Sequence, residues 1–361
     1  MAMAYSVFLV VFSLTLYFVL WVLYRFNFKV FKADESVLPL VSILIAARDE
    51  EDHIRNLLND LKGLDYPKHK LQILIGDDGS KDSTNELLRQ HAESNVQVLN
   101  IEGKVGGLKG KMNVLAQLSD LATGDQLLFT DADVRLSKNW VKGMLFSGKP
   151  KAAMLCGFTG IESTGTFQSL QHVDMVFGQG MLKVLNDLGM ANAVIGNNLL
   201  VSKDAYSKVG GHKNLPFTIV EDVALMQSFL KHGYKVYLNY TPDTYITTTG
   251  ESSWLKLMVQ RKRWMVAFAA IPLWLKIVMI IKFSFLPALL CLLQFNPWFG
   301  LFFVLKIGLA LGFYNEIAKT IKIKVAVIHV VLYEFFEPIA YFSTLIYYIL
   351  PIKVTWKGRE Y

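Results

Sequence analysis

Three acidic clusters could hold a cation or a proton: DDG at 77–79, DAD at 131–133 and ED at 221–222. Two carboxylates one residue apart in a tight loop can face one hard cation. Mg²⁺ and Mn²⁺ prefer such oxygen ligands and often bridge to phosphate oxygens. DAD therefore indicates a Mg²⁺ or Mn²⁺ site on a phosphate-bearing ligand. Each cluster also has a purely structural interpretation. DAD would be a solvated turn, the Asp-Gly of DDG would be a simple turn, and ED would cap a helix.

The segments between these clusters predict an α/β domain. Short apolar runs alternate with helical patterns from residue 40 to residue 262, and such runs are typical of strands buried on both faces. The predicted strands are VSILIA (41–46), LQILIG (71–76), VQVLNI (96–101) and QLLFT (126–130). DDG and DAD each follow one of these strands directly. Because ligands bind at the carboxyl ends of parallel strands, both clusters are expected at one crevice.

Both ends of the chain are hydrophobic, whereas its middle is not. Residues 5–24 contain no charge and are long enough to span a bilayer. Arg25, Lys29 and Lys32 follow at once, so the positive-inside rule places the N-terminus outside and the next domain in the cytosol.

The C-terminal part predicts further membrane segments, about four hydrophobic segments in all with the first. Residues 266–281 suit either a span or an interfacial helix, 283–314 are long for one helix, and 325–350 form a last segment. Glu334 and Glu337 lie inside that last segment. They are either functional charges within the membrane or part of a re-entrant or interfacial hairpin with both carboxylates near water.

The charge distribution argues against a nucleic-acid partner. The formal net charge is +7, but residues 261–361 carry 12 Lys and Arg against 4 Asp and Glu, and the rest carries 25 against 26. The basic excess thus flanks hydrophobic runs, where it suits anionic lipid headgroups. A basic face on the soluble domain, as nucleic-acid binding requires, is missing. No obligate protein partner is evident.

With these motifs in place, residues 40–264 resemble the family 2 glycosyltransferases with the GT-A fold. The matching strings occur in the family's order: VSILIAARDEE, ILIGDDGSKDST, GKMN, FTDADV, GNNLLVSKDAYSKVGG, VEDVAL and QRKRW. The last string fits the Q-x-x-R-W signature of cellulose and chitin synthases. The hydrophobic C-terminus ending in WKGREY looks like the membrane branch that includes ceramide and carotenoid glucosyltransferases.

This resemblance implies a role for each matching position. Asp222 would be the general base, and Asp131 and Asp133 would hold the metal. The remaining implied contacts are with the donor nucleotide (Ala47, Asp49, Asp77, Asp78, Lys111 and Asp131) and with the acceptor or diphosphate (Glu221, Gln260, Arg263 and Trp264). Asp49 departs from the family, which usually has Asn there. The Q-x-x-R-W string also suits a simple interfacial anchor, since Arg and Trp favour headgroup depth.

The resemblance implies an inverting enzyme that moves a sugar from UDP-glucose or UDP-N-acetylglucosamine to a membrane lipid or lipid-linked acceptor. The alternatives are a processive polysaccharide synthase and a nucleotide-binding scaffold without turnover. The expected organisation is an N-terminal transmembrane helix (1–30), a cytoplasmic GT-A domain with a Rossmann-like, mostly parallel sheet (31–264), and C-terminal interfacial and transmembrane helices (265–361). The expected location is a membrane, the cell inner membrane if the source is bacterial.

Overall fold

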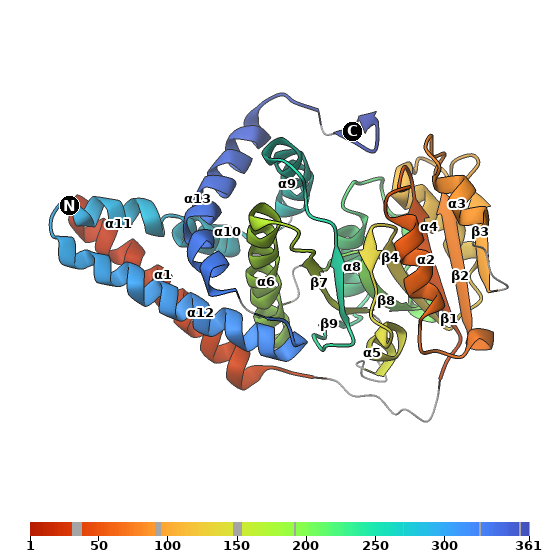
Figure 1. The fold of residues 1–361 in the computed structure, drawn as a ribbon, viewed down its shortest axis with the longest axis horizontal. Coiled ribbons are helices and arrows are strands. Elements are labelled where there is room, and N and C mark those ends of the chain that lie inside the picture. Colours follow the sequence, from red (N-terminus) through yellow and green to blue (C-terminus); the bar gives the residue numbers. More distant parts are fainter. Residues whose placement is uncertain are drawn as a thin grey trace.

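The computed structural model describes residues 1–30, 38–90, 95–146, 154–190, 193–269, 271–324, 326–353 and 355–360. Figure 1 shows a sheet with helices on its faces at one end of the molecule. Helices α1, α11 and α12 project away from the opposite side of that domain.

The central sheet has the predicted α/β arrangement. Its seven strands within the described ranges are, in spatial order, β3 (Val96–Asn100), β2 (Leu71–Asp77), β1 (Val41–Ala47), β4 (Gln126–Asp131), β8 (Asn198–Ser202), β6 (Met154–Cys156) and β9 (Val236–Leu238). The first four strands pair in parallel, which confirms the four predicted strands. β8 runs antiparallel to both of its neighbours, so the sheet is mostly parallel.

A second, smaller sheet lies beside the carboxyl end of β4. In the described part of the chain it consists of β5 (Val134–Arg135), β10 (Tyr245–Thr248) and β7 (Phe158–Ile161). β5 begins directly after the DAD motif and pairs antiparallel with β10. This pairing fixes the turn that carries Asp133.

Helices cover both faces of the central sheet. The sheet domain contains α2 (Ile54–Lys62), α3 (Thr84–Gln90), α4 (Gly110–Leu121), α5 (Trp140–Phe146), α6 (Thr166–Asp187), α7 (Lys203–Lys208) and α8 (Glu221–Lys231). Strand β1 shows why two layers form, because its side chains alternate between two cores. Ile43 and Ile45 pack with α2, α3 and α5, whereas Leu44 packs with α4 and α6. The second core continues from α6 into α1, α12 and α13.

The remaining helices form the apolar part of the molecule. They are α1 (Ala2–Asn27), α9 (Trp254–Ala269), α10 (Leu273–Phe283), α11 (Phe285–Leu293), α12 (Leu301–Ile321) and α13 (Val327–Ile349). Among the described residues, three segments are long and apolar enough to cross a membrane: Ala2–Asn27, Leu273–Leu293 and Pro297–Ile321. The predicted stretch 283–314 is thus divided, because α11 continues the segment of α10 and a 3₁₀ turn at Pro297–Gly300 begins the next one.

Helix α13 corresponds to the predicted last segment, but it is not among the three candidate spans of the described residues. Its two carboxylates are deeply buried. Glu334 and Glu337 are each 1% exposed. Lys306 of α12 forms an ion pair with Glu334, and Lys282 of α10 forms one with Glu337. The alternative in which both carboxylates lie near water is therefore wrong. The cost of burying each charge is offset by a cation from a neighbouring helix.

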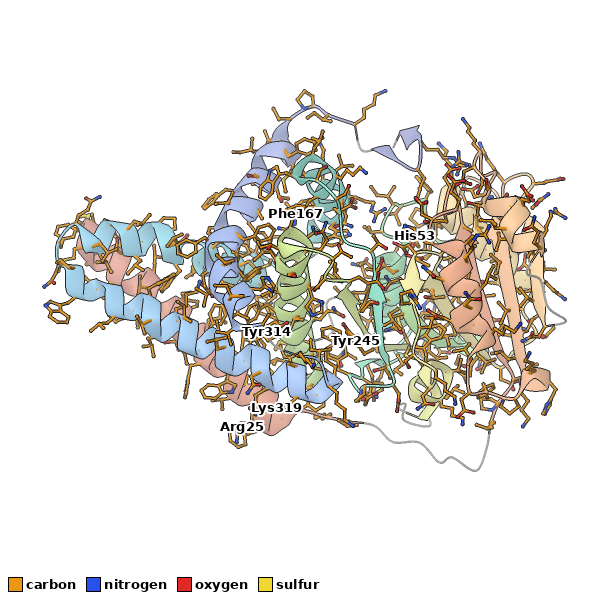
Figure 2. The ribbon with its side chains drawn as sticks, in the orientation of Figure 1. Arg25, His53, Phe167, Tyr245, Tyr314 and Lys319 are labelled. Atoms are coloured by element: carbon orange, nitrogen blue, oxygen red, sulfur yellow. The ribbon has the colours of Figure 1, made fainter. Side chains whose placement is uncertain are left out.

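The basic ends of α1 and α12 lie side by side. Glu316 is 3.3 Å from Arg25 at the end of α1 and 3.2 Å from Lys319 near the end of α12. Figure 2 shows Arg25 and Lys319 together at the end of this helix pair nearer the sheet domain. The opposite end, where Figure 1 marks the N-terminus, points away from the sheet.

Candidate active site

The DAD motif lies at the edge predicted for it. Asp131 ends β4, and Asp133 stands in the turn before β5. Thr248 of β10 donates a hydrogen bond of 2.9 Å from Oγ1 to Oδ2 of Asp133. This contact fixes one of the two carboxylates from the small sheet.

Lys111 of α4 joins two of the acidic clusters. Its Nζ lies 2.5 Å from Oδ1 of Asp131 and 3.1 Å from Oε1 of Glu221. Burial alone would lower the pKa of Lys111, but the two carboxylates outweigh it and raise that pKa. Burial, with Asp133 nearby, raises the pKa of Asp131 in turn. Lys111 therefore balances part of a concentrated negative charge.

Asp222 is the second residue of α8, and two backbone amides hold its carboxylate. Oδ2 accepts a hydrogen bond of 2.8 Å from the N–H of Gly196, and Oδ1 accepts one of 2.8 Å from Val223. A Cβ at Gly196 would lie 2.8 Å from Cβ of Asp222, so only glycine fits this close approach. Burial, reinforced by the neighbouring Glu221, raises the pKa of Asp222 to about 6. Such a carboxylate is ionised at pH 7 and is basic enough to accept a proton.

The first acidic cluster divides into two environments. Asp78 lines the cavity described below. Asp77 is not among the described residues that line this cavity. Its carboxylate instead accepts hydrogen bonds from Ser80 and from Nδ2 of Asn85. Asp77 thus shapes the loop that carries Asp78, and its contact with a nucleotide stays a prediction.

Ala47, the last residue of β1, lines the same cavity. Asp49 stands in the loop that follows and is not among the lining residues that the structure describes. Asp49 has a φ of 51°, a left-handed conformation that Asp and Asn tolerate better than most residues. Its Oδ1 accepts a hydrogen bond of 2.7 Å from the N–H of Lys81. The departure from the family's usual Asn therefore keeps the backbone geometry, and the nucleotide contact predicted for Asp49 stays untested.

A C-terminal hairpin covers this side of the site, which sequence reasoning missed. Strands β11 (Thr355–Trp356) and β12 (Arg359–Glu360) pair with each other, and Figure 1 shows the C-terminus beside the sheet domain. Arg359 pairs with the carboxylate of Asp78. Lys357 lies 3.0 Å from Oε1 of Glu50. The available signal was the basic character of the tail after an apolar helix.

The Q-x-x-R-W helix α9 forms the opposite wall. Gln260, Arg263 and Trp264 all line the cavity. Nε2 of Gln260 donates a hydrogen bond of 3.0 Å to Glu251, another lining residue that the motifs did not reveal. The structure therefore joins α9 to the carboxylates from β4 and α8, although these segments are far apart in sequence.

All these walls enclose one cavity of about 880 Å³. It brings together most of the predicted residues, namely Ala47, Asp78, Lys111, Asp131, Asp133, Glu221, Asp222, Gln260, Arg263 and Trp264. The lining also contains residues that the motifs did not single out, among them Glu50, Thr248, Glu251 and Lys357. Burial, with Asp133 nearby, raises the pKa of Glu50 to about 7.

The donor set at DAD suits a hard divalent cation. Oδ1 of Asp131 is buried and forms the ion pair with Lys111. Asp131 and Asp133 both face the cavity. Within the described residues, no group of three or more His, Cys, Asp or Glu side chains forms a metal cage. Mg²⁺ and Mn²⁺ ordinarily take one or two carboxylates and complete their shell with phosphate oxygens and water, which this arrangement allows.

Comparison with known proteins identifies the family. A model of glycosyl transferase family 21 matches residues 5–361. The chain belongs to glycosyl transferase family 21. The predicted resemblance to membrane-bound glycosyltransferases with the GT-A fold is confirmed, and the chain is a glycosyltransferase.

This family 21 enzyme is similar, at low sequence identity, to two curated proteins. A beta-monoglucosyldiacylglycerol synthase from Synechocystis sp. is 26% identical over 229 residues, which are 63% of this chain and 47% of that protein. A poly-beta-1,6-N-acetyl-D-glucosamine synthase from Staphylococcus aureus is 27% identical over 268 residues, which are 72% of this chain and 61% of that protein. The chain thus spans about half to three-fifths of these relatives.

A solved structure supports the fold. A mannosyltransferase from Pyrobaculum calidifontis, in complex with GDP-Man and Mn²⁺, superposes with a TM-score of 0.59 at 16% identity. The alignment covers 93% of this chain and 99% of that one. The predicted GT-A fold is therefore confirmed, and the likeness to this structure extends over most of the apolar helices.

Proposed function

We propose that this family 21 enzyme transfers a sugar, with inversion, from a UDP-sugar to the hydroxyl of a membrane lipid or lipid-linked acceptor. UDP-glucose and UDP-N-acetylglucosamine are the proposed donors. One observation carries the proposal. Asp131 and Asp133 lie on the same cavity as Asp222, and the third wall of that cavity is the α9 helix beside the apolar helices.

The donor half would lie between β1, β2 and β4. Ala47, Asp78 and Lys111 line this half and would contact the nucleotide. Asp131 and Asp133 would hold Mg²⁺ or Mn²⁺ on the diphosphate. The bound cation would supply Lewis-acid stabilisation of the charge that develops on the leaving UDP. Arg263 of α9 would add a fixed positive charge to the same leaving group.

The acceptor hydroxyl would lie against Asp222. The amides of Gly196 and Val223 hold this carboxylate, so its orientation does not depend on the substrate. With a pKa of about 6, Asp222 takes the proton as the acceptor oxygen attacks the anomeric carbon. The bond from that carbon to the diphosphate oxygen breaks in the same step. No covalent enzyme intermediate is required.

The position of the cavity favours a lipid acceptor. Leu255 and Trp264 line the cavity and are also 63% and 39% exposed, so an apolar edge continues outward from the site. Large apolar side chains at such a rim suit lipid contact. The basic ends of α1 and α12 are on the side of the sheet domain, which supports a cytoplasmic orientation under the positive-inside rule.

The alternative is a processive polysaccharide synthase, because the staphylococcal relative is named a poly-beta-1,6-N-acetyl-D-glucosamine synthase. A screen of UDP-sugars against total lipid extract with Mn²⁺, followed by mass analysis of the products, separates these functions. A single glycolipid supports the proposal, and a long polymer supports the alternative. If wild-type protein releases no UDP from any UDP-sugar, the chain is a nucleotide-binding scaffold. Asp222→Asn serves as the matched inactive control.

A further inference from the structure

Helix α9 has two faces, and only one of them belongs to the site. Gln260, Arg263 and Trp264 fall within about 100° of the helix circumference, because each residue advances the helix by about 100°. All three line the cavity. Arg261 and Lys262 point to the other side, where they are 5% and 8% exposed. The motif therefore places two consecutive cations in the interior of the protein.

The apolar bundle holds both buried cations by specific contacts. Nη2 of Arg261 donates a hydrogen bond of 2.6 Å to Oδ2 of Asp174 in α6. Nζ of Lys262 donates one of 2.8 Å to the carbonyl of Leu350 at the end of α13. Helix carboxyl ends carry partial negative charge, so this placement is favourable. The guanidinium also lies over the Tyr341 ring, 5.1 Å from its centroid.

Asp174 connects its contact with Arg261 to helices α13 and α10. Its Oδ1 accepts a hydrogen bond of 2.5 Å from the hydroxyl of Tyr333 in α13. That hydroxyl lies 3.0 Å from Oε1 of Glu337, which pairs with Lys282 of α10. The chain of contacts therefore runs from α9 through α6 and α13 to α10.

We infer that Asp174 is a positioning residue for the proposed transfer, which acts by fixing the rotation of α9 through Arg261. Met175, next to Asp174 in sequence, lines the cavity. The Asp174–Arg261 pair therefore lies directly behind the cavity wall. A buried guanidinium without a counter-charge is unfavourable. Nε and Nη1 of Arg261 already lack hydrogen-bond partners among the described residues. The Asp174–Arg261 contact ties this face of α9 to α6. Without that contact α9 is freer to turn about its axis, and turning would move Gln260 and Arg263 away from the donor.

This inference rests on the proposed function, and the double variant Asp174→Asn/Arg261→Met tests it without leaving an orphan charge. Replacing both members of a buried pair is often tolerated by the fold. We expect kcat to fall roughly 10- to 100-fold, as misplacement of reacting groups by about 1 Å does. The KM for the UDP-sugar should stay within about twofold, because the donor half is untouched. Asp174→Glu, which keeps the charge, should retain most of the turnover.

A pair on the same helix provides the matched control. Lys183 and Asp187 of α6 form an equally buried ion pair, which anchors the end of α1 through Lys29. Lys183→Met/Asp187→Asn should leave kcat unchanged. If both double variants keep wild-type kcat, the Asp174–Arg261 pair only stabilises the fold and the inference fails.

Maleimide labelling gives a readout that is independent of turnover. In a Cys291→Ser background, a cysteine is introduced at Trp264, which is 39% exposed, or at Met258, which is 3% exposed. With the pair intact, position 264 should label quickly and position 258 slowly. Asp174→Asn/Arg261→Met should lower the ratio of the labelling rates at positions 264 and 258 at least tenfold. An unchanged ratio would overturn the inference whatever happens to kcat. If wild-type protein shows no turnover, the proposed function fails while labelling still decides the rotation of α9. Should the double variant not fold, Asp174→Asn is labelled in its place. A smaller ratio of the two labelling rates than in the wild type supports the inference, and a wild-type ratio overturns it.

Discussion

The protonation of Asp222 should control the rate on the acidic side of neutrality. Its carboxyl has a pKa of about 6 because it is buried beside Glu221. The ionised fraction therefore falls from about nine-tenths at pH 7 to about one-tenth at pH 5. Because only the ionised form can accept the acceptor proton, kcat/KM should fall about tenfold between these pH values.

The assay is UDP release at saturating Mn²⁺ and constant ionic strength between pH 5 and pH 8. Glu50 is the main confounding group, because its pKa is about 7 and it also faces the cavity. Glu50→Gln should keep the acidic limb near pH 6, whereas Asp222→Asn should lower the rate about 10²- to 10⁴-fold and flatten the profile. A wild-type rate that does not change from pH 5 to pH 7 would refute the assignment. The assignment would also be refuted if Glu50→Gln no longer showed the fall in rate at acidic pH.

Stability provides the control for Asp222→Asn. The pKa of Asp222 is raised in the folded protein, so folding binds its proton more tightly than the unfolded chain does. The stability linked to this group is therefore complete below its ordinary pKa and is lost as the pH rises through about 6. At pH 7 the asparagine variant should unfold at a temperature no lower than wild type. A large drop would mean that lost turnover reflects misfolding.

Three other changes test separate parts of the structure. Asp133→Ala should abolish the Mn²⁺-dependent gain in UDP affinity measured by calorimetry, and an unchanged gain would remove Asp133 from the metal site. Gly196→Ala should displace the Asp222 carboxylate, because the new Cβ would lie 2.8 Å from Cβ of Asp222; kcat should fall roughly 10- to 100-fold with UDP affinity intact. Lys306→Met should destabilise the helices by ~3–5 kcal/mol in thermal unfolding, because Glu334 is left buried and unpaired, and Lys306→Met/Glu334→Leu should recover most of that loss. An equally unstable double variant would contradict this reasoning.

Local sequence patterns located the strands and the DAD motif because the physics there is local. A strand buried on both faces needs a short apolar run, and β1, β2 and β4 have one. A carboxylate directly after such a strand must lie at the sheet edge, as Asp78 and Asp131 do. The long apolar segments were readable for the same reason, since bilayer thickness sets their length.

The contacts that complete the site depend on residues far apart in the chain. Nothing near Lys111 indicates that it bridges Asp131 and Glu221. Likewise, the pairing of Arg359 with Asp78 joins positions 281 residues apart. Such contacts arise only when the sheet, α8 and the C-terminal hairpin have packed together.

The sequence by itself thus determined the sheet domain, the membrane segments and the residue types available for metal binding and proton transfer, because each follows from periodicity or composition over a few residues. Only the tertiary structure decided which carboxylates serve the cavity and which serve the fold. Asp77 and Asp78 are adjacent and chemically identical, yet one is bonded inward and the other faces the cavity. The physical reason is that burial and hydrogen-bond partners, which fix a carboxylate's charge and direction, come from elements brought together by packing.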